Sequence, residues 1–353
     1  MNNTNYSNRL SYAISWLRFP LIFLIIMLHC YSVQRLEGNH ETYFKVLYPF
    51  ALWLGETGVP GFFFISGYLF FMSRKRYRQK IEDRIHTLFI PYILWNLILL
   101  FFYLVALLLG HPLSICSKSM AEYGIVDYLR LFWDRGDFAH GNFAPLLCPL
   151  WYIRNLLFLS VISPILYIVI KYTRELFLIG IATWWMISND NAFTQQSILF
   201  FSLGSYFSIL DKNPLKIVSE RKYLFITLAC IFAFSDIFVH VAISTHFNLI
   251  IHRGALVFNI PALLLLADKA GELSSKRLYS MLSQSAFIVF CVHYPIVLFL
   301  RKICLFLFSN SSDIIHILLY FLCIILTTIL SLGIYSVLNH HFPKAKLILS
   351  GNR

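Results

Sequence analysis

The chain has 353 residues, of which 58% are hydrophobic and only 13% charged, and its mean hydropathy is +0.69. This composition excludes an ordinary water-soluble protein and indicates an integral membrane protein. The net charge of +12 does not indicate nucleic-acid binding, because most of the cations fall in loops on one side of the predicted spans.

Apolar runs of about 20 residues, the length needed to cross a bilayer, recur from Leu10 to Leu338. They predict an all-α, polytopic helical bundle of ten transmembrane helices, over residues 10–32, 45–72, 85–109, 150–170, 175–189, 194–210, 223–243, 247–267, 281–303 and 314–338. The fifth and sixth are short, and a single tilted or re-entrant hairpin is the alternative. We expect residues 1–343 to form one transmembrane domain, and residues 344–353 a short cytoplasmic tail.

Loop charges predict the orientation. When loops are assigned to alternating sides, most Lys and Arg residues fall on the side that holds both termini. The positive-inside rule therefore places both termini in the cytoplasm, and these cations would contact anionic lipid headgroups. The densest basic segment, SRKRYRQKIEDR at residues 73–84, either anchors this topology or binds phosphate, since Arg offers bidentate donors.

The longest predicted extracytoplasmic segment, residues 111–149, is rich in aromatic and charged residues. An amphipathic helix lying on the membrane is favoured, and an entrance that holds sugars is the alternative. Cys116 and Cys148 are both in this segment and could form a disulfide. No Cys/His cluster has metal-ligand spacing, so no metal is expected.

Ionisable residues inside apolar spans are costly and are functional candidates by default. Arg18 and His29 lie on one face of the first predicted helix, about 16 Å apart along its axis. Arg18, near the cytoplasmic end, could meet an anionic ligand. His29, near the outer end, suits general-base catalysis, although a structural histidine bonded to a neighbouring helix is the alternative. His293 is expected at a similar depth, where the two histidines could line one cavity.

Three further patterns contribute candidates. Asp236 and Arg253 are predicted to be intramembrane, and an ion pair would explain both without a function. Ser66 and Gly67 interrupt the aromatic run FFFISGYLFF, permitting either close helix approach or passage of a slender ligand. Trp151 and Arg154 are predicted at an outer interface, where Trp is an ordinary belt residue and Arg154 could contact a polar acceptor.

Six segments in order resemble the membrane-bound acyltransferase 3 family, whose members transfer acyl groups, usually acetyl, from cytoplasmic acyl-CoA to sugars of surface glycans. The segments extend over nearly the whole chain. They are the Arg18 to His29 pair, FFFISGYLF (62–70), DRIHTLFIPYILWN (83–96), LWYIRNLLFLSVISPIL (150–166), FFSLGSYFS (200–208) and SAFIVFCVHYPI (285–296).

The resemblance implies a ten-helix core and three residue roles: His29 as catalytic histidine, Arg18 as its accompanying intramembrane arginine, and Arg84 in the basic motif associated with the acyl donor. Two departures from the family pattern leave the donor contacts less securely placed. Ser15-Trp16-Leu17 stands where an acidic residue often precedes the arginine, and Lys80 and Arg84 stand for the usual paired arginines.

The expected function is that of a membrane O-acyltransferase of the bacterial cytoplasmic membrane. Acetyl-CoA would be the co-substrate, with its phosphates near Arg18 and Arg84 and its pantetheine arm passing Ser66 and Gly67. A glycan or lipid-linked sugar would be the acceptor, oriented by His293, Trp151 and Arg154. The main rival is a transporter or flippase of such a sugar, and a non-catalytic sensor is a second. The acyl group, the acceptor and a homo-oligomeric state stay open.

Overall fold

A computed structural model describes residues 3–32, 40–111, 113–115, 118–135, 144–188, 193–240, 245–273 and 276–352. Nearly all of these residues are helical, which confirms the predicted all-α class. In the described part of the chain the one sheet is a hairpin of β1 (Ser114–Ile115) and β2 (Lys118–Ser119). The chain divides into two compact units, Met1–Ser73 with Pro164–Gly333, and Arg74–Ser163 with Ile334–Arg353.

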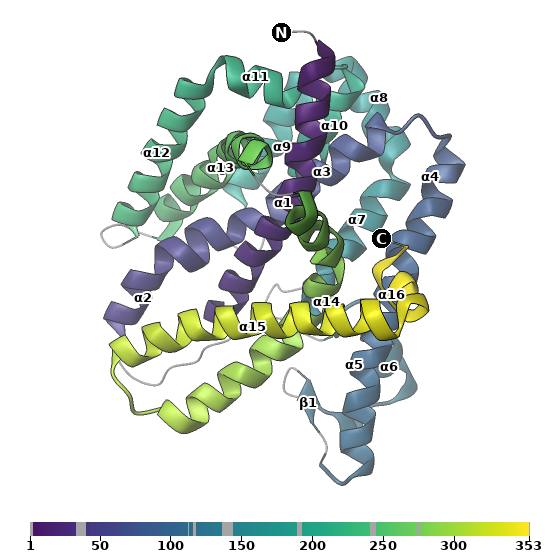
Figure 1. The fold of residues 1–353 in the computed structure, drawn as a ribbon, viewed down its shortest axis with the longest axis vertical. Coiled ribbons are helices and arrows are strands. Elements are labelled where there is room, and N and C mark those ends of the chain that lie inside the picture. Colours follow the sequence, from purple (N-terminus) through teal and green to yellow (C-terminus); the bar gives the residue numbers. More distant parts are fainter. Residues whose placement is uncertain are drawn as a thin grey trace. The chain divides into compact units, whose positions relative to one another are not determined.

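The first unit is built around α1 (Asn3–Ser32), which contacts α3 (Gly58–Met72), α13 (Thr245–Leu273) and α14 (Lys276–Phe308). Figure 1 shows α1 in purple among these helices. Apolar residues spaced three and four apart give α1 a buried stripe. The stripe includes Leu10, Ala13, Ile14, Leu17, Leu21, Ile22, Ile25 and Ile26.

The remaining elements of the first unit surround this core. They are α2 (Glu41–Tyr48), η1 (Pro49–Leu54), η2 (Gly55–Thr57), α8 (Ser163–Thr173), α9 (Glu175–Ile187), α10 (Phe193–Ile209), α11 (Pro214–Glu220), α12 (Lys222–Val239) and most of α15 (Asp313–His341).

The most extensive helix contact in the first unit joins α3 to α10, and two glycines permit it. A Cβ atom on Gly67 would lie 2.0 Å from the Phe201 carbonyl oxygen, and one on Gly204 would lie 1.9 Å from the Phe64 carbonyl oxygen. Glycine is therefore required at both positions for the two backbones to meet. Of the two roles the sequence allows for Gly67, the structure displays close helix approach.

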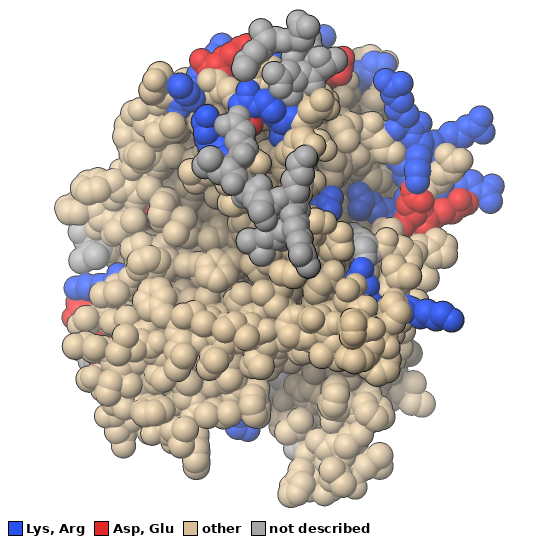
Figure 2. All heavy atoms as spheres, viewed as in Figure 1, with Lys and Arg blue, Asp and Glu red and all other residues tan. Residues whose placement is uncertain are grey.

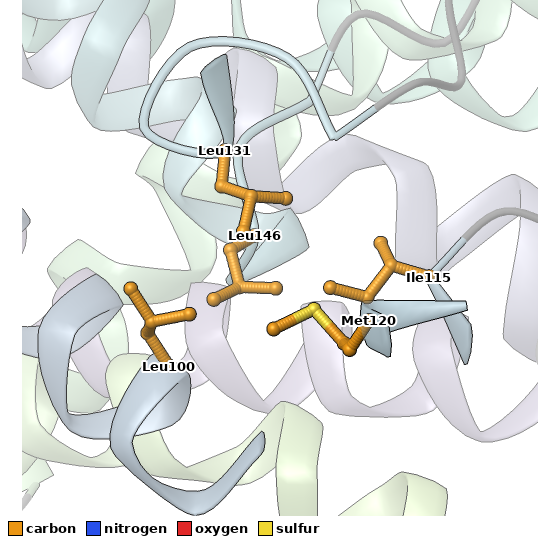
Figure 3. Packing of buried hydrophobic residues seen from close by; sticks show 5 residues of the cluster. All are labelled: Leu100, Ile115, Met120, Leu131 and Leu146. Carbon is orange, nitrogen blue, oxygen red and sulfur yellow. The ribbon is translucent and has the colours of Figure 1, made fainter. Parts of the chain in front are cut away.

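The second unit contains α4 (Tyr77–Arg84), η3 (Ile85–Phe89), α5 (Ile90–Leu108), η4 (Met120–Glu122), α6 (Ile125–Arg130), η6 (Cys148–Leu150), α7 (Trp151–Val161) and α16 (Pro343–Ser350). Its loop elements pack on α5 through Leu100, Ile115, Met120, Leu131 and Leu146 (Figure 3). The indole nitrogen of Trp95 donates to the Leu349 carbonyl at 3.0 Å, and this bond fastens α16 to α5.

The described residues of the segment 111–149 include a short helix with an uncovered apolar face. In α6, the side chains of Ile125, Val126 and Leu129 are all more than two-thirds exposed, as in a helix that lies on a membrane surface. The Lys118 ammonium and the Gly124 N–H hold the pKa of Asp127 below its ordinary value, at the N-terminal end of α6. The expected pairing with Cys148 cannot be followed, because Cys116 lies outside the described residues.

The basic segment at the start of the second unit is open to solvent. Arg74, Lys75, Arg76 and Arg78 are exposed, and Figure 2 shows Lys and Arg side chains projecting over α4. Lys75 pairs with Asp83 at 2.6 Å and Arg78 with Glu82 at 3.0 Å. Such exposed pairs contribute little to stability. Because residues 73–84 hold six Lys and Arg residues and only two acidic ones, the segment keeps an excess of positive charge.

All ten predicted segments are largely helical where the structure describes them, but they are not ten equally long spans. Among the described residues six helical stretches are long and apolar enough to cross a membrane, and a seventh is added if Cys148–Val161 and Ser163–Thr173 form one broken span. This break falls where Pro164 follows Ser163, since a helix rarely continues through the residue before proline. The predicted span 45–72 is divided among α2, η1, η2 and α3. Ten spans, and both termini in the cytoplasm, therefore stay predictions.

Candidate active site

Two histidines far apart in sequence meet inside the first unit. The rings of His29 on α1 and His293 on α14 have centroids 5.3 Å apart, and the ring of Tyr294 lies 5.1 Å from that of His29 in an edge-on arrangement. His293 is completely buried, and His29 is half-buried. The contact between α1 and α14 therefore brings two candidate proton-transfer groups together.

The hydrogen bonding of His293 fixes its tautomer. Its Nδ1 donates to the Phe290 carbonyl oxygen at 2.6 Å, and because a carbonyl only accepts, Nδ1 carries the hydrogen. Its Nε2 is buried and has no hydrogen-bond partner among the residues the structure describes. The neutral ring thus presents one unused lone pair, which accepts a hydrogen bond or a proton.

Arg18 also lies on α1, eleven residues before His29 and about 16 Å from it by helix rise. Its side chain is half-buried. Beside the preceding residue Leu17, a small apolar hollow lies between α1, α3 and α13, and Gly61 and Ile65 of α3 are among its lining residues. Ser66 follows Ile65 and is half-buried, whereas Gly67 is buried against α10.

The second unit holds the other predicted site residues. Arg84 is the last residue of α4 and immediately precedes the π-helical turn η3, a backbone form that is frequent at functional sites. Its side chain is half-buried and lies within electrostatic range of Tyr152 on α7. Trp151, the first residue of α7, is also half-buried.

Arg154 on α7 is almost buried, with 8% of its surface exposed. One terminal nitrogen donates to the Trp133 carbonyl at 2.7 Å, and the guanidinium lies 5.1 Å from the centre of the Trp133 ring. Its Nε and other terminal nitrogen reach the Asn155 amide oxygen at 3.3 and 3.1 Å. Arg154 therefore fastens the loop at Trp133 to α7.

A buried network that the sequence did not reveal lies elsewhere in the first unit. The Tyr48 hydroxyl donates to Asp236 at 2.9 Å, and Asp236 contacts His252 Nδ1 at 2.9 Å. The other ring nitrogen of His252 reaches Glu56 at 3.1 Å. The ion pair that the sequence allowed between Asp236 and Arg253 is not formed. Nothing in the pattern around Tyr48 or Glu56 marks them as partners of residues about two hundred positions away.

Arg253 instead stabilises a helix end. It donates to the carbonyl groups of Trp185, Met186 and Ser188, at the C-terminal end of α9. The last carbonyls of a helix have no partner within it, and a guanidinium there satisfies them and opposes the negative end of the helix dipole.

Replacing Tyr48 by phenylalanine is expected to lower the free energy of unfolding by about 1 to 2 kcal/mol. The ring is kept, but the buried Asp236 loses the hydrogen bond that the Tyr48 hydroxyl donates. Thermal unfolding in detergent measures this loss. Tyr172→Phe is the control, since Tyr172 is 77% exposed. Equal melting temperatures for the two variants would show that Tyr48 adds nothing to the network.

No group of three or more His, Cys, Asp or Glu side chains in the described ranges is arranged to hold a metal ion. Apolar helices long enough to span a membrane and the contact between His29 on α1 and His293 on α14 define a membrane protein with groups suited to proton transfer. The family model described as an acyltransferase domain matches residues 11–336, and the chain therefore belongs to the acyltransferase 3 family. It is a membrane acyltransferase, and this class implies an acyl donor and an acceptor. No curated protein and no solved structure matches the chain.

Proposed function

We propose that the protein transfers an acyl group, acetyl in the first instance, from cytoplasmic acyl-CoA to a hydroxyl of a cell-surface or lipid-linked glycan. The observation that carries this proposal is the contact between His29 and His293, whose ring centroids are 5.3 Å apart. The protein would act in a bacterial cytoplasmic membrane with both termini inside. Acyl-CoA is too polar to cross lipid, so a site within the membrane would let donor and acceptor meet.

Cations would hold the donor. Arg18 and Arg84 each offer the planar donor fork that matches phosphate oxygens. The exposed cations at residues 74–78 would raise the local concentration of an anionic nucleotide. The pantetheine arm would then pass the half-buried Ser66. Gly67 would act indirectly, by setting the approach of α3 to α10.

His29 would be the general base. It would take the proton of the acceptor hydroxyl as that oxygen attacks the thioester carbonyl, the carbon–sulfur bond would break, and the CoA thiolate would receive the proton. An ester and free CoA result. If His29 first accepted the acyl group, the overall balance would be the same in two steps.

His293, Trp151 and Arg154 would orient the acceptor. With its Nδ1 hydrogen committed to Phe290, neutral His293 can only accept at Nε2, which suits a bond from a sugar hydroxyl and does not suit stabilising an oxyanion. Arg154 would act by positioning the loop at Trp133, and Trp151 would offer its indole face to a sugar ring.

Acyl transfer in proteoliposomes tests the proposal. Acetyl-CoA with a radiolabelled acetyl group is supplied on one side and a glycan extract of the source cell on the other. Label in the glycan is counted, and release of free CoA is measured separately through its thiol. We expect label in the glycan together with release of CoA. Movement of glycan across the membrane without release of CoA would overturn the proposal in favour of a transporter.

A further inference from the structure

Arg301 on α14 is a buried cation whose guanidinium contacts no carboxylate among the residues that the structure describes. The residue is 2% exposed, and its three guanidinium nitrogens have no oxygen or nitrogen partner within the described ranges, the neutral Cys323 thiol beside them being a weak one. A guanidinium stays protonated at any physiological pH, so it does not avoid the cost of burial by becoming neutral. An unpaired buried charge is strongly unfavourable, so an anionic partner from beyond the described residues would stabilise it.

The groups around Arg301 do not neutralise it. Those within electrostatic range include the thiols of Cys30 and Cys323 and the hydroxyls of Tyr43 and Tyr320, all of which are neutral at pH 7 by their ordinary chemistry. Asp313 at the start of α15 is already engaged. Its carboxylate contacts His40 Nδ1 at 2.5 Å and accepts from the Tyr43 backbone N–H at 3.2 Å.

A second unmatched polar group lies in the same region. Thr327 on α15 is fully buried, and its hydroxyl lies beside the Cys30 thiol, a weak partner, with no other hydrogen-bond partner in the described part of the chain. Buried polar atoms are almost always paired in folded proteins. Arg301 and Thr327 both neighbour Cys30, and a guanidinium fork together with a hydroxyl is a donor set that binds a carboxylate or a phosphate.

The place of Arg301 relative to the histidine pair suggests which substrate carries the anion. Cys30 directly follows His29, so Arg301 lies at the end of α1 that carries the proposed base. Arg18 lies about 16 Å before His29 on the same helix. An anion bound by Arg301 would therefore be near the reacting hydroxyl and remote from the Arg18 end proposed for the donor phosphates.

We propose that Arg301 binds a carboxylate or phosphate carried by the acceptor, which makes the acceptor an acidic or phosphorylated glycan. This inference rests on the proposed function, because it assigns the substrate class of that site. Arg301 would be a specificity-determining residue and would take no part in the proton transfer.

The test compares two acceptor pools and three proteins. Envelope glycan and lipid-linked glycan are separated by anion exchange into acidic and neutral fractions, and each fraction is offered with acetyl-CoA to wild type, Arg301→Met and Lys302→Met. Lys302 is the matched control, since it is the neighbouring cation and is exposed. We expect kcat/KM for the acidic fraction to fall about 100-fold or more in Arg301→Met, and to change less than about twofold in Lys302→Met. Equal transfer to both fractions by wild type and by Arg301→Met would overturn the proposal.

Thermal unfolding separates a binding role from a structural one. Without substrate, Arg301→Met should melt at a higher temperature than wild type, because an unpaired buried charge is replaced by an apolar chain of similar length. The acidic fraction should raise the melting temperature of wild type and leave that of Arg301→Met unchanged. A lower melting temperature together with equal losses on both fractions would show a structural role and overturn the proposal.

A third arm distinguishes the source of the anion. If exchange of acetyl-CoA for succinyl-CoA made the loss in Arg301→Met depend on the donor and not on the acceptor, the carboxylate would belong to the acyl group and the acceptor assignment would be wrong. If wild type transferred no acyl group to either fraction, the proposed function would fail. The shift in melting temperature caused by the acidic fraction would still decide whether Arg301 binds an anion.

Discussion

Replacement of His29 by alanine is expected to lower the rate of acyl transfer about 100-fold to 10,000-fold, the range that a positioned general base contributes. The loss should fall on kcat, while the KM for acyl-CoA stays close to the wild-type value, because the proposed donor contacts lie toward Arg18. Initial rates of CoA release and of label incorporation into glycan, measured in proteoliposomes at several acyl-CoA concentrations, give both quantities.

The control for this experiment is His111→Ala, which removes a histidine that is exposed in the structure. It should retain wild-type kinetics. Circular dichroism and melting temperature verify that the His29 variant remains folded, which matters because the ring packs against His293 and Tyr294. Unchanged transfer by a folded His29→Ala protein would remove His29 from the chemistry.

The second large effect is expected at the glycine contact between α3 and α10. Alanine at position 67 would place its Cβ atom 2.0 Å from the Phe201 carbonyl oxygen, well inside contact distance. Because the obstructing atom belongs to a helix backbone, the two helices must separate, and we expect a loss of about 3 kcal/mol of stability. A fall in melting temperature in detergent measures it.

Gly180→Ala on α9 is the matched control, since a Cβ there meets nothing within 4 Å, and alanine should be neutral or stabilising by up to about 1 kcal/mol from helix propensity. Gly204→Ala should behave like Gly67→Ala. The double variant should cost less than the sum of the two, because one separation of the helices relieves both clashes. Similar melting temperatures for Gly67→Ala and Gly180→Ala would contradict the assigned packing.

Local composition was sufficient to predict that the chain is a helical membrane protein, because hydropathy determines whether a segment can be dissolved in lipid. It did not show where helices break. The segment 45–72 reads as one apolar run, yet the chain forms α2, η1, η2 and α3 there. Pro49 begins the π-helical turn η1, and Gly55 packs its backbone against Leu28, a contact that depends on a distant helix.

The site shows the same division between local and tertiary information. His29 and His293 stand out in the sequence because an ionisable group in an apolar run is unusual, and their juxtaposition follows from similar predicted depth. Arg301 is equally unusual in composition, but its importance depends on the absence of a described partner, which only tertiary packing reveals. The network of Asp236 and His252 with Tyr48 likewise depends on which helices meet.

The bond from His293 Nδ1 to the Phe290 carbonyl limits the routes open to a proton. An imidazole that has both nitrogens available can accept a proton at one and release another from the second, and so can conduct protons across the membrane. In His293 one nitrogen is committed to its own helix, so any proton accepted at Nε2 must leave from Nε2. A reaction centre built beside this ring can exchange protons between its substrates without opening a leak for the proton gradient across the membrane that surrounds it.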